Sequence, residues 1–379
     1  KMLDKKVFLI ILIGILISTS FSFYNIKKFD VIDSNNKSPM VRGDLLLIWK
    51  EAEAFKNDLK NNKGVLSSGI EYTRTYLPSK LLAIYSMISN KKLFDDFDKL
   101  IISKGGKFHY LILQIILYYI CLFYFYKKYR KYFNSEKKAL IILAVLAFEP
   151  TINQWHSSFW TESVFISLQI FFLGMVMSNS KSNIFYFFIG VLLGILFLQK
   201  TIALFLIVPF LIFIFISKLE KKLFKASSSL LGLIIVLLYL GYSNYLKTGI
   251  FYIMPLQAKY AHYSYMVPMI YETGDNEVEK MNTFINQEKK WIEEQDINLK
   301  IFKDKYKFVN YQKQKSIEVM KDNMIITLYI YAKNTIHHYL LNPVQVYYWH
   351  KYNQIEFSSI EHHLSKDKDK WLVPRIIYS

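Results

Sequence analysis

Long apolar blocks separated by charged segments make up this sequence, and the pattern excludes a soluble globular fold. A hydrocarbon layer about 30 Å thick requires about 20 mostly apolar residues in a helix. Mean hydropathy is positive although the chain contains 48 lysines and arginines, so apolar and charged residues must be segregated. The apolar blocks are residues 7–24, 108–126, 139–148, 163–177, 184–217 and 229–246. We therefore predict an all-α fold, a polytopic transmembrane helix bundle.

The block 184–217 is too long for one span. In a helix it would extend about 50 Å, and its only polar interruption is Gln199-Lys200-Thr201. A lysine at the centre of a bilayer costs about 2.5–3.5 kcal/mol. Placing this interruption at a membrane surface removes the cost and divides the block into two spans. The sequence therefore predicts about seven spans, with the first retained as an anchor.

The basic residues fit this number of spans. Lys5 and Lys6 precede the first span, and the loops 127–138 and 218–225 are strongly basic. The short loops 149–162 and 199–201 contain only Lys200 as a basic residue. Because short cytoplasmic loops are enriched in lysine and arginine, we expect a cytoplasmic N-terminus. As a separate expectation, the protein is an integral protein of a bacterial inner membrane.

Two hydrophilic segments then face outward, towards the periplasm. Residues 1–246 are expected to form a transmembrane module with an outer loop at 25–107, and residues 247–379 an outward mixed helical segment. In the outer loop, the stripes 45–59 and 81–88 predict amphipathic juxtamembrane helices, which either lie on the membrane face or cover a cavity between the spans. In the second segment, 277–315 is expected to be a solvated helical stretch. Residues 323–341 predict an interfacial or packed helix rather than a span, and 371–379 look like the start of a further span.

Several motifs follow one another in a consistent order. Gly43-Asp44 precedes Trp49 and Ala52, and Arg74-Thr75-Tyr76-Leu77-Pro78 leads into an apolar helix. Pro150 precedes the fourth span, which begins with Thr161-Glu162. Further along the chain, Gly190-x-x-x-Gly194 precedes Lys200. The ordered set, across about residues 7–246, resembles the GT-C superfamily, the membrane glycosyltransferases and protein mannosyltransferases that use polyprenyl-phosphate sugars. Two departures are Leu45, where the family often has a second acid, and Lys200, where arginine is commoner.

The resemblance implies roles for individual residues. Asp44 would remove the proton of the acceptor hydroxyl, and Glu162 would position the acceptor or assist Asp44. Lys200 and Arg74 would bind the donor phosphate, and Tyr76, Trp49 and His156 would line the cavity. Each polar residue also has a simpler interpretation: Asp44 as a helix N-cap, Glu162 as the acid that complements the dipole of the fourth span, Lys200 as a snorkelling side chain, and Arg74 as a surface charge.

The implied partners are a polyprenyl-phosphate sugar donor, membrane lipids, and an acceptor that is a lipid, a polysaccharide or a protein. The net charge of +18 accompanies no nucleic-acid-reading motif, so attraction to phosphate-bearing lipids is the simpler explanation. We expect no structural metal, since the adjacent pairs His337-His338 and His362-His363 point about 100° apart on a helix. A divalent cation bound together with the phosphate stays open as a cofactor.

Two other classes of function compete with this interpretation. A transporter or flippase for a lipid-linked or anionic solute would require ionisable residues inside several spans. The predicted spans contain few polar side chains, chiefly Gln114 and Gln169, which argues against ion-coupled transport. A membrane scaffold without activity would bind no polyprenyl phosphate.

Overall fold

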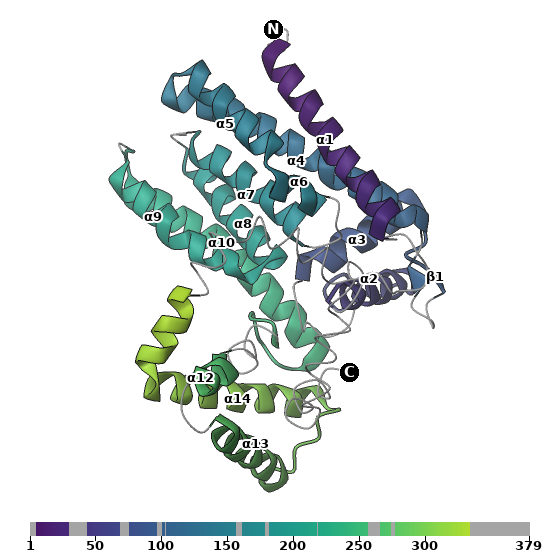
Figure 1. Ribbon diagram of the computed structural model, residues 1–379, viewed down its shortest axis with the longest axis vertical. Coiled ribbons are helices and arrows are strands. Elements are labelled where there is room, and N and C mark those ends of the chain that lie inside the picture. The colour runs from purple at the N-terminus through teal and green to yellow at the C-terminus, as the bar shows by residue number, and fades with distance from the viewer. Residues whose placement is uncertain are drawn as a thin grey trace. The chain divides into compact units, whose positions relative to one another are not determined.

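The structure, a computed structural model, describes residues 5–29, 44–68, 76–96, 101–102, 104–156, 161–178, 182–217, 219–256, 266–273 and 277–333 (Figure 1). The chain divides into two compact units, the first extending to Ile253 and the second beginning at Met254. Each unit is described by itself.

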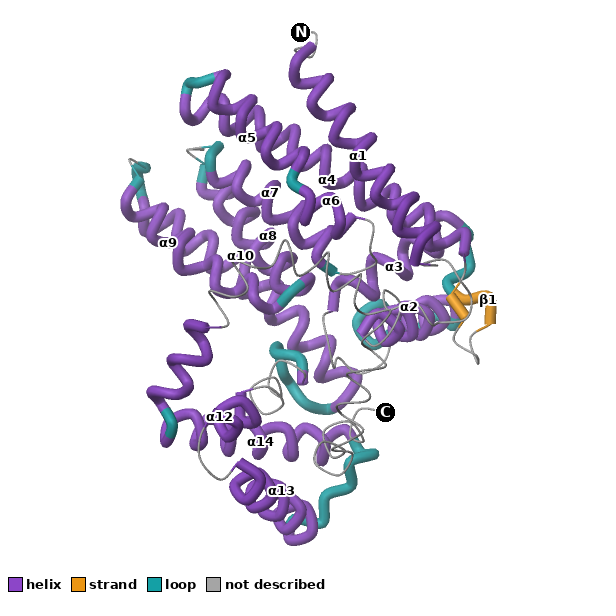
Figure 2. Tube along the Cα trace, viewed as in Figure 1, coloured by secondary structure: helices purple, strands orange, loops and turns teal. Residues whose placement is uncertain are grey.

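The first unit is almost entirely helical, as Figure 2 shows. Its helices are α1 (Lys5–Phe29), α2 (Asp44–Lys60), α3 (Tyr76–Ser89), α4 (Lys104–Phe133), α5 (Glu136–Phe148), α6 (Pro150–His156), α7 (Glu162–Val176), α8 (Asn183–Gln199), the 3-10 helix η1 (Thr201–Leu206), α9 (Ile207–Ile216) and α10 (Lys222–Thr248). Among the described residues, the strands are β1 (Phe94–Asp96) and β2 (Ile101–Ile102), an antiparallel pair. The sequence did not predict this pair, which is too short to show an alternating pattern.

Within the described ranges, three helices are long and apolar enough to cross a membrane: Lys5–Phe23, Tyr110–Phe133 and Lys222–Thr248. The segments Glu162–Val176, Asn183–Gln199 and Thr201–Ile216 are apolar but shorter. The predicted interruption of the block 184–217 is present, because α8 ends at Gln199 and Lys200 has an extended backbone (φ −155°, ψ 122°) before η1. The helical fold with candidate membrane spans is thus confirmed, whereas the total of seven spans stays a prediction.

Glycines bring α8 and α10 into close contact. A Cβ atom at Gly190 would overlap the carbonyl oxygen of Ser229, and one at Gly232 would overlap that of Phe187. Further along both helices, a Cβ atom at Gly194 would meet the Val236 side chain at 2.5 Å. Close packing at small residues is typical of helices in membranes. Gly194 and Val236 both lie further along their helices than Gly190 and Ser229. The helices α8 and α10 therefore run parallel, which requires the intervening α9 to return to the opposite side.

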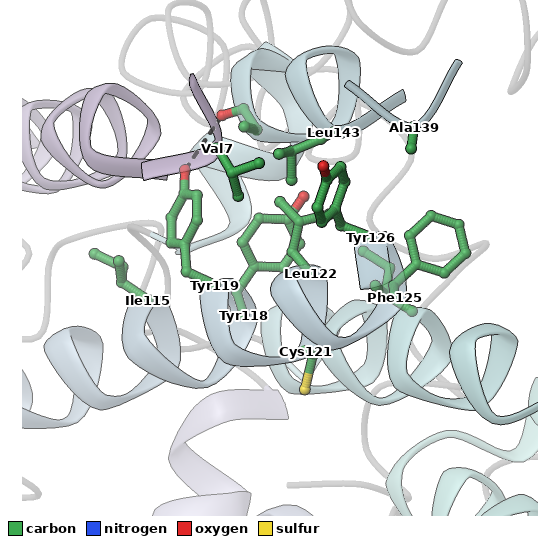
Figure 3. Packing of buried hydrophobic residues seen from close by; sticks show 12 residues of the cluster. Val7, Ile115, Tyr118, Tyr119, Cys121, Leu122, Phe125, Tyr126, Ala139 and Leu143 are labelled. Carbon is green, nitrogen blue, oxygen red and sulfur yellow. Dashed lines mark hydrogen bonds between the residues drawn. The ribbon is translucent and has the colours of Figure 1, made fainter. Parts of the chain in front are cut away.

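A second packing centre joins α1, α4 and α5. Figure 3 shows Val7 of α1, Tyr119 and Leu122 of α4 and Leu143 of α5 pointing towards one another, and all four are buried. A polar network lies in the same region: Ser18 Oγ donates to Asn153 Oδ1 and lies 3.1 Å from Tyr119 Oη. Because unpaired polar groups are costly in an apolar interior, this network ties α1 to α4 and α6.

Many large apolar side chains of this unit face outward. On α9, Val208 is 60% and Ile216 78% exposed, and on α10 Leu223 is 70% exposed. In water such a surface would be an aggregation hazard. In a bilayer it is the surface expected to contact lipid tails.

The second unit contains α12 (Val267–Thr273), α13 (Glu277–Glu294) and α14 (Phe302–Asp322). Val267, Phe284 and Val309 belong to its small core, and the Trp291 ring stacks on Tyr311 with centroids 4.3 Å apart. The charged stretch 277–315 is therefore helical, as predicted, but divided between two helices. Asn323 ends α14, and a further apolar helix, Met324–Lys333, follows it.

Candidate active site

Glu162 and Lys200 form an ion pair where the start of α7 lies beside the end of α8. Glu162 is the first residue of α7 and Lys200 follows the last residue of α8. The Nζ atom of Lys200 lies 2.5 Å from Oε1 of Glu162, and the Gln199 side-chain amide donates to the Thr161 carbonyl at 3.0 Å. The two side chains keep 36% and 19% of their surface exposed. The structure thus brings together two residues that the motifs placed in one site, in a position that a ligand can reach.

This pair is chemically suited to a charged substrate. A carboxylate at the start of a helix is stabilised by the helix dipole, and an ammonium group is a point charge able to bind phosphate. Glu162 neutralises part of the Lys200 charge in the absence of a ligand. An arriving phosphate would compete for Lys200 and leave the Glu162 carboxylate available to accept a hydroxyl proton or hydrogen bond.

His156 lies next to this pair in the protein interior. It is the last residue of α6, it is fully buried, and its Nδ1 atom lies 2.7 Å from Ser163 Oγ. Its ring contacts that of Tyr118, with centroids 4.4 Å apart. Burial lowers the pKa of His156 to about 3, so the imidazole is neutral at physiological pH. It therefore supports the start of α7 through Ser163 and is not exposed to solvent.

The remaining predicted residues belong to the outer loop. Asp44 is the first residue of α2, but its side chain and all of Arg74 lie outside the described residues. Trp49 of α2 and Tyr76 of α3 are buried, at 2% and 5% exposure. The Tyr76 hydroxyl lies 3.4 Å from that of Tyr239 on α10, and burial raises the pKa of Tyr76, so the phenol stays protonated.

Sequence reasoning missed a second group of charges beside Tyr76, which we call the basic cluster: Lys80 of α3 and Lys247 of α10. The Nζ atoms of Lys80 and Lys247 lie 5.0 and 5.6 Å from the centroid of the Tyr76 ring. Lys80 is 8% exposed, donates to the Ser68 carbonyl at 3.2 Å and lies 3.3 Å from the centroid of the Phe55 ring.

Burial determines the protonation state of Lys80. Burial, and then repulsion by Lys247, lower the pKa of Lys80 to about 6, whereas the carboxylates of Glu51 and Asp58 act in the opposite direction. With that pKa, Lys80 is mostly a neutral amine at neutral pH. A bound anion would favour its protonation again, so the basic cluster can gain positive charge when an anion arrives.

The position of Lys80 two residues after Pro78 was the one available signal, because it extends the Arg74–Pro78 motif. Lys247 sits at the end of a span, where a lysine is usually a snorkelling side chain. Only the contact of α3 with α10 makes them a pair. Within the described ranges, no group of three or more His, Cys, Asp or Glu side chains is placed to hold a metal ion.

A comparison with known protein families finds a match to the central part of the chain. The family described as dolichyl-phosphate-mannose-protein mannosyltransferase matches residues 99–242, from just before α4 into α10. No curated protein and no solved structure matches the chain. The match supports a membrane glycosyltransferase of the mannosyltransferase type, and it includes both Glu162 and Lys200. Residues 99–242 are therefore similar to the dolichyl-phosphate-mannose-protein mannosyltransferase family, which belongs to the GT-C superfamily that the ordered motifs resemble.

Proposed function

We propose that the protein transfers a sugar from a polyprenyl-phosphate donor to an acceptor hydroxyl at the outer face of a bacterial inner membrane, with inversion at the anomeric carbon. The observation that carries this proposal is the Glu162–Lys200 ion pair, which joins the start of α7 to the end of α8 inside the region that matches the mannosyltransferase family. In this pair, Glu162 supplies a carboxylate that can bind the acceptor hydroxyl, and Lys200 supplies a positive charge that can bind the donor phosphate.

In the proposed reaction, the acceptor oxygen attacks the anomeric carbon while the bond from that carbon to the phosphate oxygen breaks. The acceptor proton passes to a carboxylate, for which Asp44 is our candidate, and the polyprenyl phosphate leaves with its electron pair. A single displacement inverts the configuration at the anomeric carbon. Glu162 orients the acceptor hydroxyl in this scheme.

The phosphate needs positive charge as it departs. Lys200 and Arg74 are the candidates from the sequence, and the basic cluster adds Lys80 and Lys247, which flank the buried Tyr76 ring. Charge-assisted hydrogen bonds to an oxyanion are among the strongest electrostatic contributions to catalysis. Protonation of Lys80 on binding of the donor would give the basic cluster additional positive charge to bind the phosphate. No metal ion takes part in this scheme.

The test is donor turnover by the full chain in vesicles, with polyprenyl-phosphate mannose as donor. We expect Asp44→Asn and Lys200→Met to abolish sugar release from the donor and Lys200→Arg to retain part of it. Lys222→Met is the matched control, because Lys222 opens α10 at the opposite end of that helix from Lys247. Undiminished release by Asp44→Asn would remove Asp44 from the mechanism, and undiminished release by Lys200→Met would contradict the proposed site.

A further inference from the structure

The helix Met324–Lys333 of the second unit carries an apolar surface on two sides. Ile326, Thr327 and Ile330 face inward, with Thr327 and Ile330 6% and 4% exposed and Ile326 packed against the cluster of Met266 and Ile270. These contacts account for one side of the helix. They leave the opposite side to be explained.

That opposite side is equally apolar and is open. Ile325 is 85% exposed, Met324 64%, Leu328 57% and Tyr329 56%. Leu328 and Tyr329 follow Ile325 by three and four residues, and Met324 directly precedes Ile325, so the four side chains form one continuous face over the first turns of the helix. We call them the outer face of this helix. A helix that is apolar all round is either buried in protein or in contact with lipid.

We propose that the outer face of Met324–Lys333 inserts into the headgroup–acyl boundary of the same bilayer that holds the first unit. The inference is independent of sugar transfer. It assigns the surface a lipid partner rather than a protein.

Three observations favour lipid. No charged residue lies between Asp322 and Lys333, while Lys321 and Lys333 are exposed at the two ends, where they can reach anionic headgroups. Tyr329 and the 41% exposed Tyr331 have the apolar ring and polar hydroxyl typical of membrane interfaces. The second unit also begins at Met254, shortly after α10, a candidate span, ends at Thr248. Such a short tether keeps the local concentration of bilayer surface high.

A fluorescence experiment on the full chain in vesicles tests the proposal. Cys121 is the only cysteine, so a Cys121→Ser background accepts one bimane label at Ile325→Cys or Leu328→Cys. The control label is at Lys313→Cys, an exposed position on α14 of the same unit. Vesicles of phosphatidylcholine and phosphatidylglycerol are prepared with and without bromine on the lipid acyl chains, which quenches only fluorophores in contact with those chains.

We expect brominated lipid to cause a loss of bimane emission at positions 325 and 328 and none at 313. Unquenched, blue-shifted emission at 325 and 328 would mean that another protein segment or a second copy covers the face, and would overturn the proposal. Emission typical of water at these positions would overturn it as well. Equal quenching at all three positions would show that the whole unit is embedded, which also contradicts insertion by one face.

Discussion

The Nζ atom of Lys200 lies 2.5 Å from Oε1 of Glu162, across 38 positions of sequence. The pair is partly exposed, and an ion pair of this kind contributes about 0.5–1 kcal/mol to stability at most. The ion pair therefore contributes little to the stability of the fold. We propose that its main role is in sugar transfer.

Glu162→Gln keeps the size of the side chain and removes its charge. We expect a loss of about two orders of magnitude in transfer rate, which is typical when one electrostatic group is removed from an active site. The midpoint of thermal unfolding should change little. Glu220→Gln, at an exposed position before α10, is the matched control for rate and midpoint. Equal rates for the two variants would exclude a role for Glu162.

The depressed pKa of Lys80 predicts a pH dependence of stability. Folding lowers this pKa from its ordinary value of 10.5 to about 6, so between these values the unfolded chain binds more protons than the folded one. The free energy of unfolding should then rise with pH across this window. We expect the unfolding midpoint to rise between about pH 6.5 and about pH 8.5, and to rise less in Lys80→Met. Lys60→Met, at an exposed lysine of α2, should behave like the unchanged protein. The same slope in all three would show that Lys80 is charged in the folded state.

Gly190→Ala should separate α8 from α10, because the added Cβ atom would overlap the Ser229 carbonyl oxygen. Overpacking of this kind costs about 1–3 kcal/mol, and here the obstacle is backbone, which cannot rotate away. Thermal unfolding in detergent measures the loss. Gly64→Ala serves as control, since its Cβ atom would meet only Ser67 Oγ at 3.6 Å. An unchanged midpoint for Gly190→Ala would contradict the close packing of the two helices.

Asn153→Ala should loosen the attachment of α1. The Asn153 side chain accepts from Ser18 and donates to the Ala147 and Glu149 carbonyls at 3.1 and 2.9 Å. Leaving such buried groups unpaired costs about 1–3 kcal/mol. If the groups act through each other, the double variant with Ser18→Ala will lose less stability than the sum of the two single variants. Additive losses would show that the two residues stabilise the fold separately.

The sequence predicted the features that depend on local pattern. Apolar length identified the helices, and the cost of a lysine in lipid located the end of α8 at Gln199. Features that depend on contacts between distant segments were harder to predict. Lys80 and Lys247 are each ordinary in sequence and become unusual only because α3 and α10 bring them together. The ordered motifs anticipated the proximity of Glu162 and Lys200 only because they resemble a family in which these positions share a site.

The parallel course of α8 and α10 has an electrical consequence. Antiparallel neighbours cancel their helix dipoles, whereas parallel neighbours add them, and each carboxyl end carries about half a negative elementary charge. The carboxyl ends of α8 and α10 point the same way, and each is accompanied by a lysine, Lys200 after one and Lys247 in the last turn of the other. These lysines oppose a negative field that the backbone itself creates. Replacing either lysine would remove a contact. It would also make the electrostatic potential at that end of the helix pair more negative, which disfavours the approach of an anion.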